Sequence, residues 1–141
     1  VEKSKDLYDV IIVDSTESIG HAQTLFSDRF YKACASLLGR KGIFVCQSGS
    51  PFLQPNELST SFERCSRFFK NTSYYLAPIP TYMGGFLAIA FATQTDYYSH
   101  INAKFLSEKT KGLEPELGYY NSNIHQASFV LPNYIRKNLQ Q

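Results

Sequence analysis

Four consecutive apolar residues, Val10 to Val13, constrain the fold of this chain more strongly than any other feature. Val and Ile at every position of such a run, without polar alternation, are typical of a strand buried on both faces, as in a parallel sheet. Parallel strands need crossover connections, which are usually helices. We therefore expect an α/β fold in which ligands bind just beyond the carboxyl end of this strand.

Two acidic residues follow the run: Asp14 comes directly after it, and Glu17 comes three residues later. Two carboxylates at the carboxyl end of a strand can bind a small cation or serve as a base. A simpler interpretation is that Asp14 only caps a turn through its side chain. The pattern alone leaves both interpretations open.

Helical and strand periodicities alternate along the rest of the chain. We expect, in order, a strand at 9–13, a helix after the N-cap Ser27 that ends at Gly39, a strand at 43–46, a helix from near Pro55 to Asn71, strands at 73–79 and 86–93, a helix at 97–108, a loop at 112–118, and short helices at 122–129 and 133–140. Helical crossovers make the first three strands parallel, whereas the short turn around Gly84 and Gly85 makes the last two antiparallel. Parallel strands that end in an antiparallel hairpin are typical of the second half of a nucleotide-binding α/β domain.

The features of the first half of such a domain are not found in these residues. No strand is followed by a Gly-rich loop, and no further strand carries an acid for a ribose. The run at 10–13 is also unusually apolar for an edge strand. We therefore expect either that the chain is a fragment or that another chain covers this strand.

Composition narrows the classes of partner. The 141 residues suffice for one domain, and a net charge of +2 indicates neither a nucleic acid nor an anionic membrane as partner. The apolar stretch from Phe86 to Ala92 is too short to span a membrane. Cys34, Cys46 and Cys65 lie within apolar patterns, so we expect buried thiols in a reducing, cytoplasmic compartment, with no disulfide framework and no metal site.

Longer segments resemble the spermidine synthases, the polyamine aminopropyltransferases, and most of all the bacterial members. The matching segments run in order over nearly the whole chain: Tyr8–Thr16, Leu25–Phe26, Phe30–Tyr31, Gly42–Gln47, Ala77–Tyr82, Gly84–Gly85, Tyr119–Asn121, Ile124–His125 and Ala127–Pro132. Family members have a small β-domain followed by a methyltransferase-like Rossmann domain. By this resemblance, residues 1–141 are the second half of the Rossmann domain plus C-terminal helices, and the β-domain and the cofactor-binding half would lie before Val1.

The resemblance implies transfer of an aminopropyl group from decarboxylated S-adenosylmethionine to putrescine or a similar diamine, giving spermidine and methylthioadenosine. The donor is a co-substrate, and no tightly bound cofactor is implied. Family members commonly form homodimers or homotetramers. Because the residues that hold the donor would precede Val1, we expect the chain alone to be inactive.

The resemblance also assigns roles to residues of the loop after the first strand. In the family, the first acid of an Asp-x-x-Asp run accepts the proton of the attacking amine, and the second acid holds the substrate amine. The corresponding residues are Asp14 and Glu17. Ser15 and Thr16 belong to the same substrate-binding loop, and Ser15 is also expected to contact the donor.

Gln47 and Tyr82 match family positions that line the polyamine channel. A Tyr beside an alkyl diamine offers both apolar contact and a hydroxyl acceptor. The simpler alternatives are that Gln47 satisfies loop backbone groups and that Tyr82 only fills its turn. His100 and His125, in or near the C-terminal helices, are interpreted as packing or surface residues.

The loop departs from the family pattern Asp-Ser-Thr-Asp-Pro-x-Gly-Pro. Glu17 is one methylene longer than the usual Asp, and Ser18 and His21 replace prolines, which makes the loop less stiff. His21 lies where the family's proline contacts methylthioadenosine, so it either tunes donor binding or points to solvent. A shifted amine preference and a degraded enzyme are both consistent with these changes.

Two other functions stay open at this point. One is a small-molecule methyltransferase on the same fold, against which the paired acids and the turn at Tyr82 argue. The other is a non-catalytic paralogue that assembles with an active subunit, which the altered loop permits.

Overall fold

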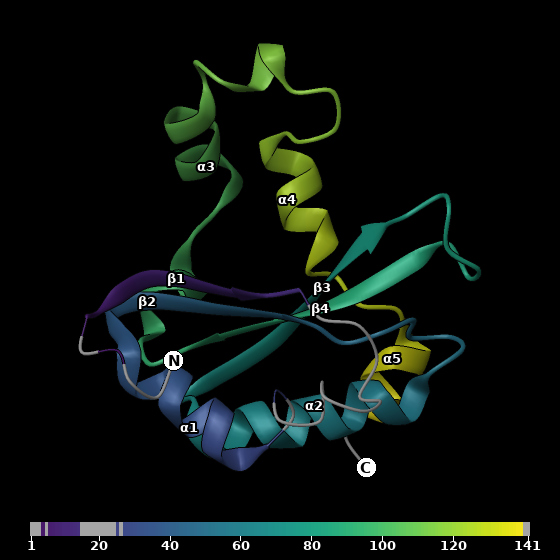
Figure 1. Cartoon of the computed structure of the whole chain (residues 1–141). Helices are drawn as coiled ribbons and strands as arrows, with labels where there is room; N and C mark the ends of the chain where they lie inside the picture. Colours follow the sequence, from purple (N-terminus) through teal and green to yellow (C-terminus); the bar gives the residue numbers. More distant parts are fainter. Residues whose placement is uncertain (1–3, 5, 15–24, 26, 140–141) are drawn as a thin grey trace.

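The computed structural model of the chain describes residues 4, 6–14, 25 and 27–139. These residues form one mixed sheet with helices on both sides (Figure 1). The elements are β1 (Tyr8–Val13), α1 (Asp28–Leu37), β2 (Leu38–Gln47), α2 (Pro55–Phe68), β3 (Asn71–Pro78), β4 (Phe86–Thr93), η2 (Asp96–His100), α3 (Ala103–Thr110), η3 (Glu114–Glu116), α4 (Ser122–Ser128) and α5 (Asn133–Asn138). None of the described helices is long and apolar enough to cross a membrane.

The strands of the sheet lie in the order β1-β2-β4-β3. β1 and β2 pair in parallel, whereas β4 pairs antiparallel with both of its neighbours. β1, β2 and β3 therefore run in one direction, and β4 lies between β2 and β3 against that direction. The predicted α/β fold, with parallel strands that end in an antiparallel hairpin, is confirmed.

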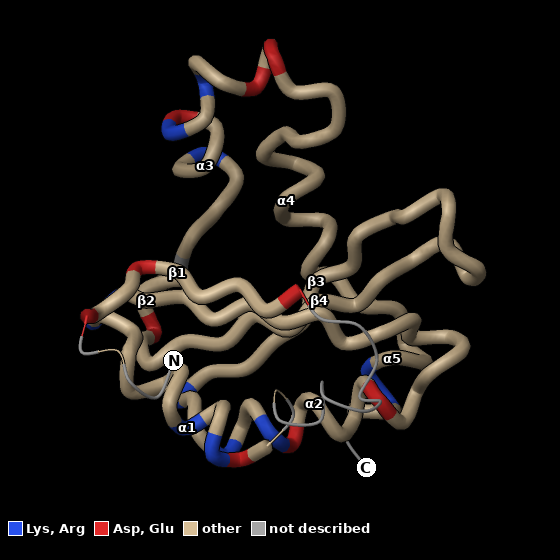
Figure 2. Tube along the Cα trace, in the orientation of Figure 1, with Lys and Arg blue, Asp and Glu red and all other residues tan. Residues whose placement is uncertain are grey.

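The main core lies between the sheet and the helices α1 and α2 (Figure 1). Phe44 on β2 is fully buried and stacks on Phe69 at the end of α2, with 4.9 Å between the ring centroids. Charged residues gather on the outer side of both helices (Figure 2). The amphipathic spacing of the two helices therefore determines which face packs on the sheet.

The predicted start of α1 is confirmed, but its predicted end is wrong. The Ser27 Oγ accepts a hydrogen bond of 3.2 Å from the Phe30 N–H and caps the helix. Gly39 does not stop the helix, because Leu38 is already extended and begins β2 directly. No left-handed glycine cap is needed where a helix passes straight into a strand. The later glycine, Gly42, is the constrained one, since a Cβ there would lie 2.7 Å from the Leu38 Cβ.

Two other boundaries differ from the prediction. Asn71 begins β3 and does not end α2, which stops at Phe68. The predicted helix at 97–108 is two helices, η2 and α3. The Asn102 Oδ1 accepts a hydrogen bond of 3.0 Å from the Phe105 N–H, so a side-chain cap starts a new helix in the middle of the predicted one.

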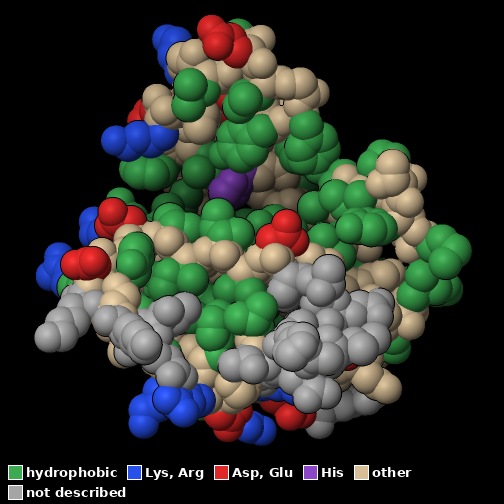
Figure 3. Space-filling model, in the orientation of Figure 1, with side chains coloured by type: hydrophobic (Ala, Val, Ile, Leu, Met, Phe, Trp, Pro, Cys, Tyr) green, Lys and Arg blue, Asp and Glu red, His purple; other side chains and the backbone are tan. Residues whose placement is uncertain are grey.

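β1 is the edge of the described sheet, and its outer face is apolar. Val10 is 48% exposed and Ile12 is 70% exposed, whereas Val13 on the other face is buried against the core. Apolar side chains gather on the side of the sheet that faces α3 and α4 (Figure 3). The strand predicted to be buried on both faces is thus covered on only one face by described residues.

Candidate active site

The carboxyl ends of β1 and β2 lie side by side. Val13 pairs with Cys46 at the last position of the parallel ladder, so Asp14 and Gln47 are the next residues of two neighbouring strands. Neighbouring strands are about 4.8 Å apart. Asp14 is exposed and Gln47 is half-buried. The structure therefore brings the predicted base and one predicted channel residue together at the carboxyl ends of two neighbouring strands.

Tyr82 lies at the same end of the sheet, in the turn between β3 and β4. β3 runs in the direction of β1 and β2, so its carboxyl end and the turn after it point the same way. The Tyr82 N–H donates to the Ile79 carbonyl at 3.0 Å, and the Tyr82 carbonyl accepts from the Gly85 N–H at 3.0 Å. Tyr82 is 54% exposed, so it is not buried within the turn.

The segment after Gln47 continues the pairing with β4 beyond the strand. The Ser48 N–H donates to the Ala88 carbonyl, and the Ala88 N–H donates to the Gly49 carbonyl, each at 2.9 Å. The sequence indicated only a polar loop here, because these bonds join segments far apart in the chain. Gln47 is held by this pairing between the end of β1 and the hairpin that carries Tyr82.

The remaining predicted site residues cannot be placed. Ser15, Thr16, Glu17 and His21, with the rest of the predicted loop, lie outside the described residues. The expectation that Asp14 and Glu17 converge on one cavity therefore stays a prediction.

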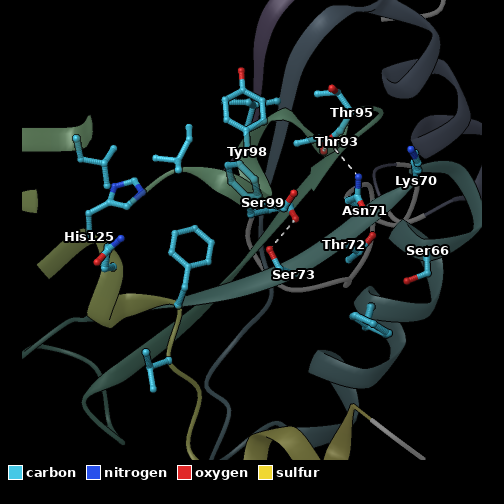
Figure 4. A pocket seen from close by; sticks show the side chains of 18 residues that line it. Ser66, Lys70, Asn71, Thr72, Ser73, Thr93, Thr95, Tyr98, Ser99 and His125 are labelled. Carbon is cyan, nitrogen blue, oxygen red and sulfur yellow. Dashed lines mark hydrogen bonds between the residues drawn. The ribbon is translucent and has the colours of Figure 1, made fainter. Parts of the chain in front are cut away.

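A cleft of about 940 Å³ lies elsewhere, around the amino end of β3 and below α4 (Figure 4). Its wall includes Ser73 and Thr93 of the sheet, Tyr98 of η2, and the aromatic residues His125 and Phe129. Asp14, Gln47 and Tyr82 do not line it. The described part of the predicted site and this cleft are separate.

His125 is held in the wall of this cleft by packing. Its ring centroid lies 5.5 Å from that of Phe129, and its Nδ1 lies 3.2 Å from the Tyr120 hydroxyl. Burial lowers the pKa of His125 below its ordinary value. These contacts agree with the interpretation of His125 as a packing residue. The side chain of His100 lies outside the described part of the structure.

Comparisons of sequence and of structure with known proteins give concordant matches. The family model described as "Spermine/spermidine synthase domain" matches residues 1–104. The polyamine aminopropyltransferase of Buchnera aphidicola subsp. Schizaphis graminum is 40% identical over 141 residues, which are 100% of this chain and 49% of the relative. The chain spans about half the length of the curated relatives it matches.

Solved structures agree with the sequence matches. A spermidine synthase in complex with the transition state analogue AdoDATO superposes with a TM-score of 0.87 at 35% identity, over 99% of this chain and 47% of that chain. The spermidine synthase from Thermotoga maritima superposes with a TM-score of 0.84 at 35% identity, over 99% of this chain and 46% of that chain. The described sheet and helices are therefore similar to the methyltransferase-like fold of these enzymes.

Proposed function

This chain belongs to the spermine/spermidine synthase family, and on that premise we propose that it acts in aminopropyl transfer from decarboxylated S-adenosylmethionine to putrescine or a similar diamine. The observation that carries the proposal is the placement of Asp14 and Gln47 at the carboxyl ends of neighbouring parallel strands, with Tyr82 on the hairpin at the same edge. A diamine is a dication, and an anionic side chain at this edge attracts it.

Asp14 is the proposed proton acceptor. A primary amine is mostly protonated at neutral pH, so its lone pair becomes available only when a nearby base takes a proton. The free amine then attacks the methylene beside the sulfonium of the donor. A carbon–nitrogen bond forms, the carbon–sulfur bond breaks with its electron pair moving to sulfur, and methylthioadenosine leaves. The proton lost by the amine ends on the Asp14 carboxylate.

The other predicted residues complete this proposal. Gln47 and Tyr82 contact the diamine along its length, and Tyr82 combines an apolar ring with a hydroxyl acceptor. Ser15, Thr16 and Glu17 form the loop that holds the far amine, and the chain departs here from its family by the longer Glu17. By the family resemblance, Ser15 and His21 are the residues of this loop proposed to contact the donor.

We propose further that polypeptide outside these 141 residues covers β1 and contributes the donor site. The exposed apolar side chains of Val10 and Ile12 support this proposal, because such a surface is rarely left in water. Homodimers or homotetramers are the expected assembly. The chain alone is expected to make no spermidine from putrescine and the donor, and spermidine in that assay would contradict this part of the proposal.

The test of acceptor binding is calorimetric titration of the 141-residue chain with putrescine. Butanediol, which has the same length and no charge, is the matched control ligand. We expect putrescine to bind and butanediol not to bind, and we expect Asp14→Asn to weaken putrescine binding by on the order of tenfold. Equal affinity of the native chain and Asp14→Asn for putrescine would contradict the role of Asp14.

The same titration, made on the full-length protein with its donor site, separates the alternative functions. A small-molecule methyltransferase would bind S-adenosylhomocysteine and no diamine. A non-catalytic paralogue that has lost its acceptor site would bind neither putrescine nor methylthioadenosine, even when assembled with an active subunit.

A further inference from the structure

The turn after β2 and the turn between β3 and β4 approach each other most closely at Gly84, beside Ser50 and, at ordinary contact distance, Leu53. A Cβ added at Gly84 would lie 2.9 Å from the Ser50 Oγ, which is closer than ordinary van der Waals contact. Ser50 comes three residues after Gln47, and Gly84 comes two residues after Tyr82. The contact therefore joins the turn after Gln47 to the turn that carries Tyr82.

The Ser50 side of this contact is held by Gln54. The Ser50 N–H donates to the Gln54 Oε1 at 3.1 Å, and the Ser50 carbonyl accepts from the Gln54 N–H at 2.8 Å. Gly49 has a φ of +78°, and a Cβ there would lie 2.8 Å from the Gln54 Oε1. Ser50 itself is buried. The backbone of Ser50 is thus bonded on both sides and has little room to move.

The hairpin around Gly84 is held less firmly than Ser50. Residues 81–84 are exposed, and the turn is held mainly by the bonds that Tyr82 makes with Ile79 and Gly85. Gly84 has a φ of +90° and Gly85 has a φ of +71°. A side chain at Gly84 would therefore push the hairpin away from Ser50, and not Ser50 away from the hairpin.

From this geometry we propose that the Ser50–Gly84 contact sets the distance between Tyr82 and Gln47 and thereby selects the length of the diamine. The proposal rests on the proposed function and makes Ser50 and Gly84 positioning residues. A methyl group at Gly84 has to move by roughly half an ångström to reach ordinary contact with Ser50. That movement lengthens the path between Gln47 and Tyr82, so the site comes to favour a longer diamine.

Gly84→Ala is the test variant, and Gly85→Ala is its matched control. Both glycines have positive φ in one turn, so both variants carry the backbone strain of an Ala there. Nothing lies within 4 Å of a Cβ at Gly85, so only Gly84→Ala meets Ser50. Ser50→Ala combined with Gly84→Ala removes the Oγ and should cancel the push. Gly84→Ala alone and the double variant therefore differ in this contact and in the hydrogen bond of 3.5 Å that the Leu53 N–H donates to the Ser50 Oγ. Ser50→Ala alone is the control for the loss of that bond.

The measurement is NMR titration of the 141-residue chain with putrescine, with the one-methylene-shorter diaminopropane and with the one-methylene-longer cadaverine. For Gly84→Ala we expect the ratio of cadaverine to putrescine affinity to rise by on the order of tenfold. Gly85→Ala and the double variant should keep the native ratio. Without ligand, the Tyr82 amide signal should shift in Gly84→Ala and return in the double variant.

Three results would contradict the proposal that this contact selects the length of the diamine. They are an equal effect of the two glycine variants, an effect of Gly84→Ala that persists in the double variant, and an unchanged ratio in Gly84→Ala because the Ser50 hydroxyl simply rotates away. Failure of the proposed function is distinguishable: the native chain would then bind none of the three diamines. The Tyr82 amide shift and its reversal would still support or overturn the contact between the two turns.

Discussion

Val13 of β1 lies opposite Cys46 of β2 at the final pair of the parallel ladder. Both side chains are buried toward the helices, so the chain presents its next residues, Asp14 and Gln47, at the sheet edge just outside the core. Because rigid strands fix the positions of Asp14 and Gln47, a substitution that changes the charge at Asp14 should not disturb the packing of the core. The first prediction uses this separation.

Asp14→Asn should abolish aminopropyl transfer while leaving the fold intact. The variant keeps the size of the side chain but removes the proton acceptor, and we expect the rate to fall by about 10²–10⁴-fold. The assay can use a chimera of this chain with the N-terminal half of the Buchnera relative. Asp9→Asn, at the other end of β1, is the matched control and should keep its rate. Near-normal turnover of Asp14→Asn would show that another group takes the proton.

Glu17→Asp should change the preference among diamines. The substitution restores the usual family residue and withdraws the carboxylate by about 1.5 Å, the length of one carbon–carbon bond. We expect the relative KM values for diamines of different length to change, with the shape of the pH profile unchanged. Steady-state kinetics of the same chimera measure this. Identical kinetics for every diamine would show that Glu17 does not contact the substrate.

The cysteine thiols should be unreactive in the folded chain. Burial raises the pKa of Cys34 and Cys46 to about 11 and that of Cys65 to about 12. The thiolate is the reactive form, and it is scarce and inaccessible in these positions. A colorimetric thiol reagent at mildly alkaline pH should therefore label none of the three native thiols and all three in guanidinium chloride. Fast labelling of the native chain would contradict the buried placement.

His125 should make the folded state less stable as the pH falls. Its pKa is lowered by burial from an ordinary value of 6.5, so the unfolded chain binds the proton more readily. The contribution of neutral His125 to stability is fully present above pH 6.5. It is lost as the pH falls from 6.5 through the lower pKa of the folded state. Denaturant unfolding at several pH values should show that the free energy of unfolding depends less on pH in His125→Gln than in the native chain.

A second variant separates burial from hydrogen bonding at this histidine. Tyr120→Phe removes the hydroxyl that lies 3.2 Å from the His125 Nδ1 but leaves the aromatic packing. Since burial is the cause of the lowered pKa, this variant should keep the native pH dependence. A pH dependence that vanishes in Tyr120→Phe would show that the hydrogen bond is the main cause.

Tyr74→Phe should destabilise the core through a lost hydrogen bond. The buried Tyr74 hydroxyl donates to the Leu58 carbonyl at 3.0 Å and is also bonded to the Ser61 Oγ. Removing it leaves buried polar groups without this partner, at a cost of about 1–3 kcal/mol in the free energy of unfolding. Urea unfolding measures the change. Tyr82→Phe, at an exposed position, is the control and should change stability by less than about 0.5 kcal/mol.

Elements whose signals are local were predicted well. The strand at 86–93 was predicted with its observed bounds, because an apolar run follows a turn that two glycines mark. The cap at Ser27 was likewise read from one side chain and its neighbours. The end at Gly39 was predicted wrongly, because a glycine after a helix is a common stop but not a required one.

The candidate site was predicted as a set of residues and only partly as an arrangement. Asp14 was recognised because it follows a buried strand, and Gln47 because it matches a family position. Parallel pairing of their strands then places them together. The contact between Ser50 and Gly84 had no signal in the sequence. Neither residue belongs to a periodic pattern, and the contact joins two turns separated by one helix and one strand.

By itself, the sequence determined the order of helices and strands, the face of each helix that packs on the sheet, and the positions at which polar residues follow strands, because each depends on spacing within a few residues. Only the tertiary structure decided that β4 separates β2 from β3, and that the hairpin carrying Tyr82 lies against the turn after Gln47. Pairing between distant strands is chosen by the packing of the whole sheet, and no local pattern encodes it.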